Sequence, residues 1–186
     1  MEFKKYNHLK EEKRISNFWI KKGCFKPKKG KTKKTFSVVI PPPNITGRLH
    51  MGHALNNSLQ DVLIRFNRMK GNETLWQPGT DHAGIATQAI VEKNLETEGL
   101  KKNELGRDKF IKKVWKWKED SGGIILDQLK KLGCSCDWSR TRFTMDKDLS
   151  HAVIKVFVDL YNKKLIYKDK KLVNWDTALQ TAISDL

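Results

Sequence analysis

The stretch PPPNITGRLHMGHAL, residues 41 to 55, marks a junction between a predicted strand and a predicted helix. The residues before it, FSVVI (36–40), form a short β-branched run that is typical of a buried strand. The three prolines must end that strand, because they fix φ and donate no backbone hydrogen bond. Asn44 and Gly47 then predict a turn, since glycine tolerates positive φ and close approach by a ligand.

A helix predicted over residues 49–70 brings His50 and His53 onto one face of its first turn. Gly52 between them leaves room for a flat ring such as a nucleobase. Helix N-termini favour negative charge, so two imidazole donors at this end suit a triphosphate on which charge develops. The residue types alone also allow that the two histidines are ordinary helix-start residues.

A second loop of the same kind follows the next predicted strand, TLWQ (74–77). This loop, PGTDHAG, precedes a helix predicted over residues 85–98. Ligands of open α/β sheets bind at the carboxyl ends of the strands, so Asp81 is placed to hold an ammonium group. Two alternatives stay open: Asp81 caps the helix that follows, or Asp81 and His82 join His50 and His53 in a zinc site.

The order strand, helix, strand, helix predicts an α/β protein with a Rossmann-type parallel sheet flanked by helices. The other predicted elements are helices over 9–22, 106–132 and 148–164 and short strands at 166–168 and 171–175. We expect the apolar stripes of the helices to face inward. These stripes comprise Met51, Leu55, Leu59, Val62, Phe66 and Met69, then Phe110, Val114, Trp117, Ile125, Leu129 and Leu132, then Leu149, Val153, Val156, Phe157 and Leu160. A weak point is expected at Gly122 and Gly123.

The chain has 186 residues and a formal net charge of +16, so polyanions are its natural partners. No apolar run approaches the roughly 20 residues that span a bilayer, and we expect a cytoplasmic protein without membrane contact. Three cysteines with a Cys-x-Cys pair favour reduced structural thiols over a zinc knuckle.

Four blocks in this order resemble the valyl-tRNA synthetases, a family of class I aminoacyl-tRNA synthetases. The blocks are PPPNITGRLHMGHAL, GTDHAGIATQ (79–88), DWSRTRFTMD (137–146) and LVNWDTALQTAISDL (172–186). HMGH resembles the His-x-Gly-His signature of class I enzymes, which are Rossmann-type and make an aminoacyl-adenylate from ATP. The isoleucyl and leucyl families usually carry tryptophan where this chain has Thr80, which favours valine.

The resemblance implies roles for individual residues. His50 and His53 would be catalytic and would stabilise the α-phosphate in the transition state; the residues implied for ATP are Pro43, Asn44, His50, Gly52 and His53. Those implied for valine are Pro41, Pro42, Asn44, Thr80, Asp81 and Gln88, with Asp81 taking the α-ammonium. ATP chemistry implies Mg²⁺, and the full-length enzyme is expected to act on tRNA(Val) as a monomer.

The resemblance also has gaps. A Lys-Met-Ser-Lys-Ser-like loop and an anticodon-binding domain do not occur in these residues, Thr177 stands where the family has proline, and Arg48 is larger than expected. We therefore expect a fragment: an N-terminal helix and basic linker over 1–35, then the first half of the catalytic domain over 36–186, ending near the editing insertion. Alone it should be inactive or weakly active. The alternative hypothesis is a non-catalytic basic nucleic-acid-binding module.

Overall fold

The computed structural model describes residues 6–28, 30, 34–178 and 180–183. The chain separates into two compact units, Met1–Asp146 and Lys147–Leu186. The first unit contains, in chain order, α1 (His8–Lys21), β1 (Thr35–Val39), α2 (Met51–Met69), β2 (Glu73–Gln77), β3 (Gly79–Thr80), α3 (Gly84–Thr97), α4 (Lys102–Leu105), α5 (Arg107–Lys131), the 3₁₀ turn η1 (Trp138–Arg140) and β4 (Arg142–Phe143). The second unit contains α6 (Lys147–Asn162), β5 (Trp175–Asp176) and β6 (Thr181–Ala182).

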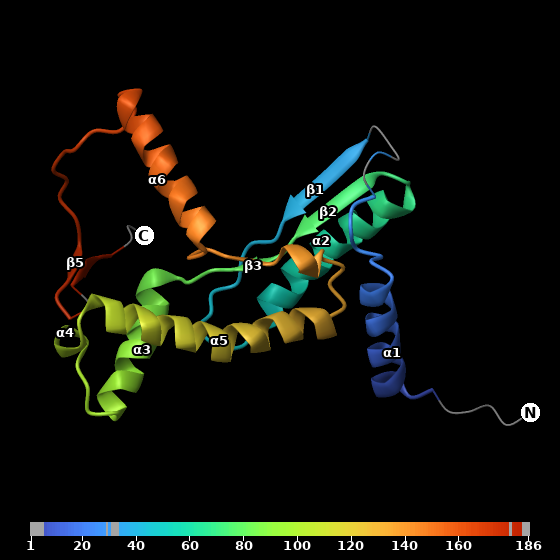
Figure 1. The fold of residues 1–186 in the computed structure, drawn as a ribbon, viewed down its shortest axis with the longest axis horizontal. Coiled ribbons are helices and arrows are strands. Elements are labelled where there is room, and N and C mark those ends of the chain that lie inside the picture. Colours follow the sequence, from blue (N-terminus) through green and yellow to red (C-terminus); the bar gives the residue numbers. More distant parts are fainter. Residues whose placement is uncertain (1–5, 29, 31–33, 179, 184–186) are drawn as a thin grey trace, which may run out of the picture. The chain divides into compact units, whose positions relative to one another are not determined.

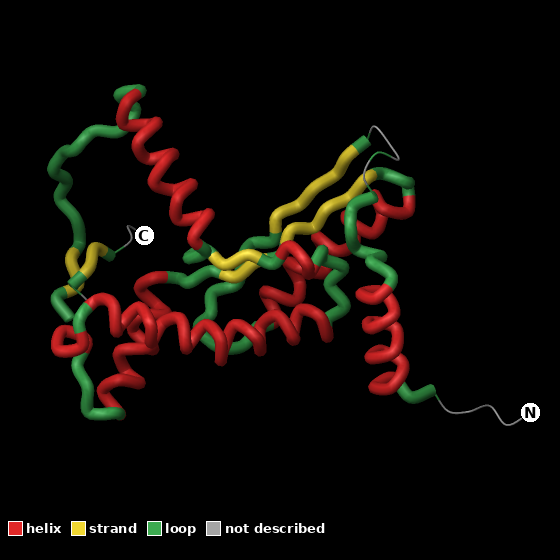
Figure 2. The backbone as a smooth tube through the Cα atoms, in the orientation of Figure 1, coloured by secondary structure: helices red, strands yellow, loops and turns green. Residues whose placement is uncertain are grey.

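The strands of the first unit pair in parallel, as the sequence predicted. β1 pairs with β2 over five residues each, from Thr35↔Glu73 to Val39↔Gln77. β3 pairs with β4 at two positions. Figures 1 and 2 show both strand pairs. The fold class is therefore α/β with parallel strands.

β1 is more exposed than the sequence predicted. Phe36 and Val38 are partly buried, whereas Val39 is 73% exposed. Burial alternates along β1, so Phe36 and Val38 lie on the covered face whereas Ser37 and Val39 lie on a face that nothing covers among the described residues. The expectation of a buried strand was therefore wrong for one of its two faces.

The helix α2 forms where the sequence predicts it, and Gly71 follows it with a positive φ of 80°. Its apolar stripe, however, faces solvent: Leu59 and Val62 are 61% and 64% exposed, and Met51 and Met69 more so. The opposite face, with Ile64 and Asn57, is buried against the strands and α5. The prediction that the stripe lies inward was therefore wrong.

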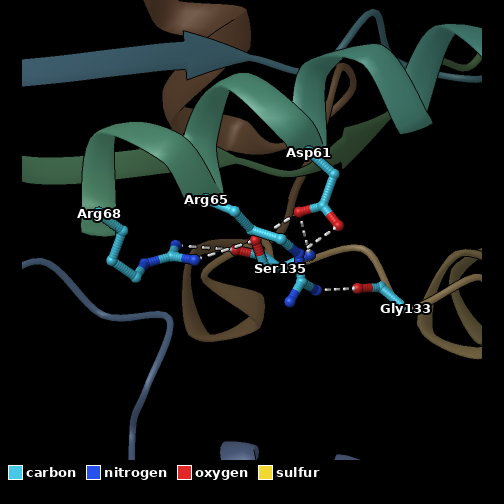
Figure 3. A network of polar contacts seen from close by, with 5 residues as sticks. All are labelled: Asp61, Arg65, Arg68, Gly133 and Ser135. Atoms are coloured by element: carbon cyan, nitrogen blue, oxygen red, sulfur yellow. Dashed lines mark hydrogen bonds and ion pairs between the residues drawn. The ribbon is translucent and has the colours of Figure 1, made fainter. Parts of the chain in front are cut away.

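Polar contacts fix the buried side of α2 to the loop after α5 (Figure 3). The Arg65 guanidinium donates to the Gly133 carbonyl at 2.7 Å, and Arg68 donates to the Ser135 hydroxyl at 3.0 Å. The backbone N–H of the fully buried Ser135 donates to Asp61 at 3.1 Å. Because charged groups pair with polar groups that burial would otherwise leave unsatisfied, this network holds α2 in one orientation.

The main core is built from residues of the strands, α2, α5 and the loop that follows α5. Its buried members are Ile40, Ile45, Ile64, Trp76, Ile125, Leu129, Cys134, Cys136 and Phe143. A second cluster, Val91, Leu95, Phe110 and Val114, joins α3 to α5.

The helix α5 continues without a break through the glycine pair that was expected to be a weak point. Gly122 is buried, and a Cβ there would lie 3.9 Å from Ile45, so packing against this loop supports the helix. Leu132, expected to face inward, is 44% exposed because it caps the helix end. The helix α4 and the strand β4 were not predicted, since four and two residues are too few for a periodic pattern.

The second unit has less regular structure than the sequence predicted. The strands expected at 166–168 and 171–175 are absent from the described residues except for Trp175, which starts β5. A strand needs a partner, and in this unit β5 and β6 pair over only two residues each. The stripe of α6 is also not buried, with Val153, Val156 and Phe157 between 55% and 68% exposed. Thr177 lies in the turn after β5.

The two faces of α2 give a matched test of this packing. Ile64→Ala removes a fully buried side chain and should lower the free energy of unfolding by about 2–5 kcal/mol. Leu59→Ala, on the exposed face, should change it by less than about 0.5 kcal/mol. Urea unfolding followed by circular dichroism measures both, and similar losses in the two variants would contradict the assigned orientation of α2.

Candidate functional site

The carboxyl ends of β1 and β2 are joined by a backbone ladder that continues past the prolines. The N–H of Ile40 donates to the Gln77 carbonyl at 3.0 Å. Beyond Pro41 and Pro42, Asp81 N–H donates to the Pro43 carbonyl at 2.8 Å, and Ile45 N–H donates to the Asp81 carbonyl at 3.0 Å. Asn44 and Asp81 thus form a parallel bridge, which places the two predicted loops side by side.

The start of α2 is capped by the two histidines of the opening motif. His50 is the N-cap, and its Nδ1 accepts a hydrogen bond from the Gly52 N–H at 3.1 Å. His53 reaches back, and its Nδ1 accepts from the His50 N–H at 3.3 Å. The ring centroids are 4.0 Å apart with the planes tilted by 51°. The reciprocal arrangement is that of a capping box, with imidazoles in place of the usual hydroxyl and carboxylate.

This capping determines which ring nitrogens can donate to a ligand. A neutral imidazole that accepts at Nδ1 carries its proton on Nε2. His50 and His53 therefore each present an Nε2–H donor. The pKa of His53 is lowered by burial and, to a smaller degree, by the neighbouring His50, which favours the neutral ring.

A cavity of about 350 Å³ lies between the proline loop and the first turns of α2. It brings together most of the predicted site residues: Pro41, Pro42, Pro43, Asn44, His50, Gly52 and His53. Asn56 and Asn57 complete the lining and were not predicted. Asn57 donates to the His53 carbonyl at 2.7 Å, but its buried Oδ1 has no partner among the described residues.

The other predicted residues, Thr80, Asp81 and Gln88, do not line this cavity. Gln88 and His82 line a second cavity of about 580 Å³ between α3 and α5. Thr80 is buried in β3, and its carbonyl accepts from the Thr144 N–H. The structure thus does not bring Gln88 into the cavity of the histidines. Asp81 does not cap α3, since the N-cap is Ala83, although its Oδ1 accepts the Ala83 N–H at 3.1 Å.

The helix α5 supplies two anchors for the loop between β1 and α2. The Trp117 indole donates to the Ile45 carbonyl at 2.7 Å, and Gln128 accepts the Leu49 N–H at 2.9 Å. The tryptophan lies on the predicted inward stripe, and a buried indole N–H usually needs an acceptor, so this contact had a signal in the sequence. Gln128 had none.

The described residues do not group three His, Cys, Asp or Glu side chains closely enough to hold a metal ion, so the zinc alternative lacks a ligand set there. Cys134 and Cys136 are unpaired and buried. Burial raises the pKa of the Cys134 thiol to about 12, and the same cause raises that of Cys136, so both thiols stay protonated. None of the described helices has the length and apolarity needed to cross a membrane.

Parallel strands with a capped helix and a cavity at their carboxyl ends define an α/β protein with its candidate site at the strand ends. The chain belongs to the family of tRNA synthetases class I (I, L, M and V), whose sequence pattern matches residues 14–186.

Two similar proteins are both valine--tRNA ligases. The protein of Pelagibacter ubique is 69% identical over 182 residues, which cover 98% of this chain and 21% of that protein. The protein of Nitrobacter winogradskyi is 59% identical over 186 residues, which cover 98% of this chain and 20% of that protein. The chain therefore spans about a fifth of the length of these relatives.

A solved structure supports the fold. The ternary complex of LeuRS, tRNA and LeuAMS from Agrobacterium radiobacter K84 matches with a TM-score of 0.76 and 27% identity. The match covers 96% of this chain and 21% of that one. It confirms the Rossmann-type α/β class predicted from the sequence.

The imidazole cap predicts a pH dependence of stability. Because the pKa of folded His53 lies below that of an unfolded histidine, the unfolded chain takes up its proton first as the pH falls. The free energy of unfolding should therefore decrease from about pH 7.5 to about pH 5.5. His53→Gln keeps an acceptor at the third helical position but does not titrate, so the decrease should be smaller. Urea unfolding at both pH values measures the difference, and equal pH dependence in both proteins would contradict the assignment.

Proposed function

We propose that the chain supplies the ATP and valine half-site of a valine--tRNA ligase, which activates valine to valyl-adenylate and transfers it to tRNA(Val). The observation that carries this proposal is the pairing of the capped α2 start with the Asp81 loop across one backbone bridge. The similarity to valine--tRNA ligases over nearly the whole chain supports it.

The lining of the smaller cavity fits the substrate ATP. His50 and His53 offer Nε2–H donors beside a helix N-terminus, where negative charge is favoured. Gly52 lets the His50 ring lie directly against the helix start, since a Cβ there would lie only 2.9 Å from that ring. The buried Oδ1 of Asn57 is an acceptor that needs a donor. Pro43 and Asn44 form the facing wall.

Valine would lie between the proline loop and Asp81. Pro41 and Pro42 offer a rigid apolar surface for a small branched side chain. The Asp81 carboxylate, 34% exposed, would accept the α-ammonium. Thr80 would contribute to amino-acid binding through the backbone of β3. Gln88 would contribute its side chain from α3.

The reaction is in-line attack of the valine carboxylate on the α-phosphorus of ATP, with pyrophosphate as the leaving group. The chain needs no nucleophile or general base, because the carboxylate is already a nucleophile. His50 and His53 would donate to the oxygens on which charge develops, and Asp81 would orient the amino acid.

The remaining parts of the proposal concern the whole protein. Mg²⁺ would enter with ATP, and the described residues offer no ligand set of their own for it. We place the protein in the cytoplasm and expect the full-length enzyme to be monomeric, with residues 1–35 as an N-terminal helix and linker and 36–186 as the first half of the catalytic domain.

The alternative of a nucleic-acid-binding module is not favoured. The similarity to valine--tRNA ligases extends over 98% of this chain, so a synthetase function accounts for the sequence better than a separate binding module does.

Valine-dependent exchange of labelled pyrophosphate into ATP tests the proposed function in the full-length product of the gene. His53→Ala should lower the exchange rate by about a hundredfold, because it removes one donor to the developing charge. His8→Ala, an exposed histidine in α1, is the matched control and should leave the rate unchanged. Exchange that does not depend on valine, or an active His53→Ala protein, would refute the proposal.

Gly52→Ala separates nucleotide binding from stability. The new Cβ must displace the His50 ring, so the dissociation constant for ATP should rise by about tenfold. Stability should change by less than about 1 kcal/mol, because the helix propensity gained with alanine offsets the loss of the His50 cap. Gly123→Ala in α5, where a Cβ would contact nothing within 4 Å and no cap is lost, should gain up to about 1 kcal/mol of stability without loss of ATP binding. Calorimetric titration and urea unfolding measure the two quantities, and unchanged ATP affinity in Gly52→Ala would count against the nucleotide site.

A further inference from the structure

The hydroxyl of Thr144 lies at the centre of a small polar cluster beside Asp81. Thr144 follows β4, and its N–H donates to the Thr80 carbonyl at 3.2 Å, so it extends the parallel pairing of β3 with β4. Phe143 before it is buried in the main core. Asp146 after it accepts the Phe143 N–H at 3.0 Å and closes a turn. The neighbouring residues Phe143 and Asp146 therefore fix the backbone position of Thr144.

The number of donors and acceptors around this hydroxyl determines the direction of each of its hydrogen bonds. Thr144 Oγ1 accepts the His82 backbone N–H at 2.9 Å, lies 2.6 Å from His82 Nδ1, and lies 3.0 Å from Asp81 Oδ1. An ionised carboxylate only accepts, so the single hydroxyl proton goes to Asp81. The two lone pairs then accept from His82, whose Nδ1 must carry a proton. The hydroxyl is saturated by these three partners.

The same contacts use only one oxygen of the Asp81 carboxylate. Oδ1 accepts from Thr144 and from the Ala83 N–H at 3.1 Å, and it lies 3.3 Å from His82 Nδ1. Among the described residues Oδ2 has no hydrogen-bond or ion-pair partner. The carboxylate is thus fixed in rotation with one oxygen left for a ligand.

We propose that Thr144 is a positioning residue for the amino-acid substrate: it holds Asp81 so that Oδ2 receives the α-ammonium. The inference rests on the proposed function and adds a residue to that site. Thr144 acts through Asp81 and does not itself contact the substrate. Charge-assisted hydrogen bonds are strong and directional, and a carboxylate free to rotate would meet the ammonium in fewer productive orientations.

Substitutions at Thr144 test this role in the full-length product of the gene by valine-dependent pyrophosphate exchange. Thr144→Val removes the hydroxyl with little change of shape, and it should raise KM for valine by about ten- to a hundredfold while KM for ATP stays within about twofold. Thr144→Ser keeps the hydroxyl and should restore KM for valine to within about threefold of the unsubstituted protein. Thr144→Ala is a second variant without the hydroxyl and should match Thr144→Val.

A neighbouring threonine supplies the control for general loss of a hydroxyl. Thr141 Oγ1 donates to the Trp138 carbonyl at 2.9 Å and is not among the described hydrogen-bond partners of Asp81, so Thr141→Val should leave KM for valine unchanged. An unchanged KM for valine in Thr144→Val and Thr144→Ala would overturn the inference. So would a parallel rise in both KM values, or failure of Thr144→Ser to restore valine affinity.

Asp81→Asn separates this inference from the proposed function. If the function is right, Asp81→Asn should raise KM for valine at least as much as Thr144→Val, because it weakens the ammonium contact directly. A strong effect of Asp81→Asn together with wild-type behaviour of Thr144→Val would overturn the role of Thr144 alone. No valine-dependent exchange by the unsubstituted protein would overturn the proposed function and this inference with it.

Discussion

The backbone ladder that continues past the three prolines is the contact on which the site depends. Proline cannot donate, so after Ile40 the ladder resumes through acceptors: the Pro43 carbonyl takes the Asp81 N–H, and the Asp81 carbonyl takes the Ile45 N–H. These two bonds fix the register of the loops beyond β1 and β2. Without them, the helix that carries the histidines and the loop that carries the acid would share a sheet edge but no defined spacing.

Local chain signals predicted the longer elements of the first unit well, because proline and glycine act on the backbone directly. β1 ends shortly before Pro41, α2 ends shortly before Gly71, and α3 is followed by Gly99 at positive φ. Burial was predicted less well. An apolar stripe shows where hydrophobic side chains gather but not what covers them, and in α2 the covered face is the one that carries Ile64 and the Asp61 network.

The residues of the candidate site were also predicted well where local spacing determines the geometry, and poorly where tertiary contacts determine it. His50, Gly52 and His53 come together because they lie within one helical turn, where spacing alone determines the geometry. Thr144 and Gln128 were not foreseeable, since each reaches the site through tertiary contacts between residues more than 60 positions apart. The pairing of β3 with β4 is too short to leave a periodic pattern in the sequence.

Close approach of β3 to β4 explains why a glycine precedes the acid. A Cβ at Gly79 would lie 2.9 Å from the Arg142 carbonyl oxygen, which is backbone and cannot move aside without separating the strands. Separation would withdraw Thr144 from Asp81, because both follow directly from this pair. The orientation of one carboxylate therefore depends on the absence of a side chain two residues earlier. In the proposed function, the Asp81 carboxylate receives the ammonium of the amino acid, and the two histidines donate N–H groups to the reacting phosphate.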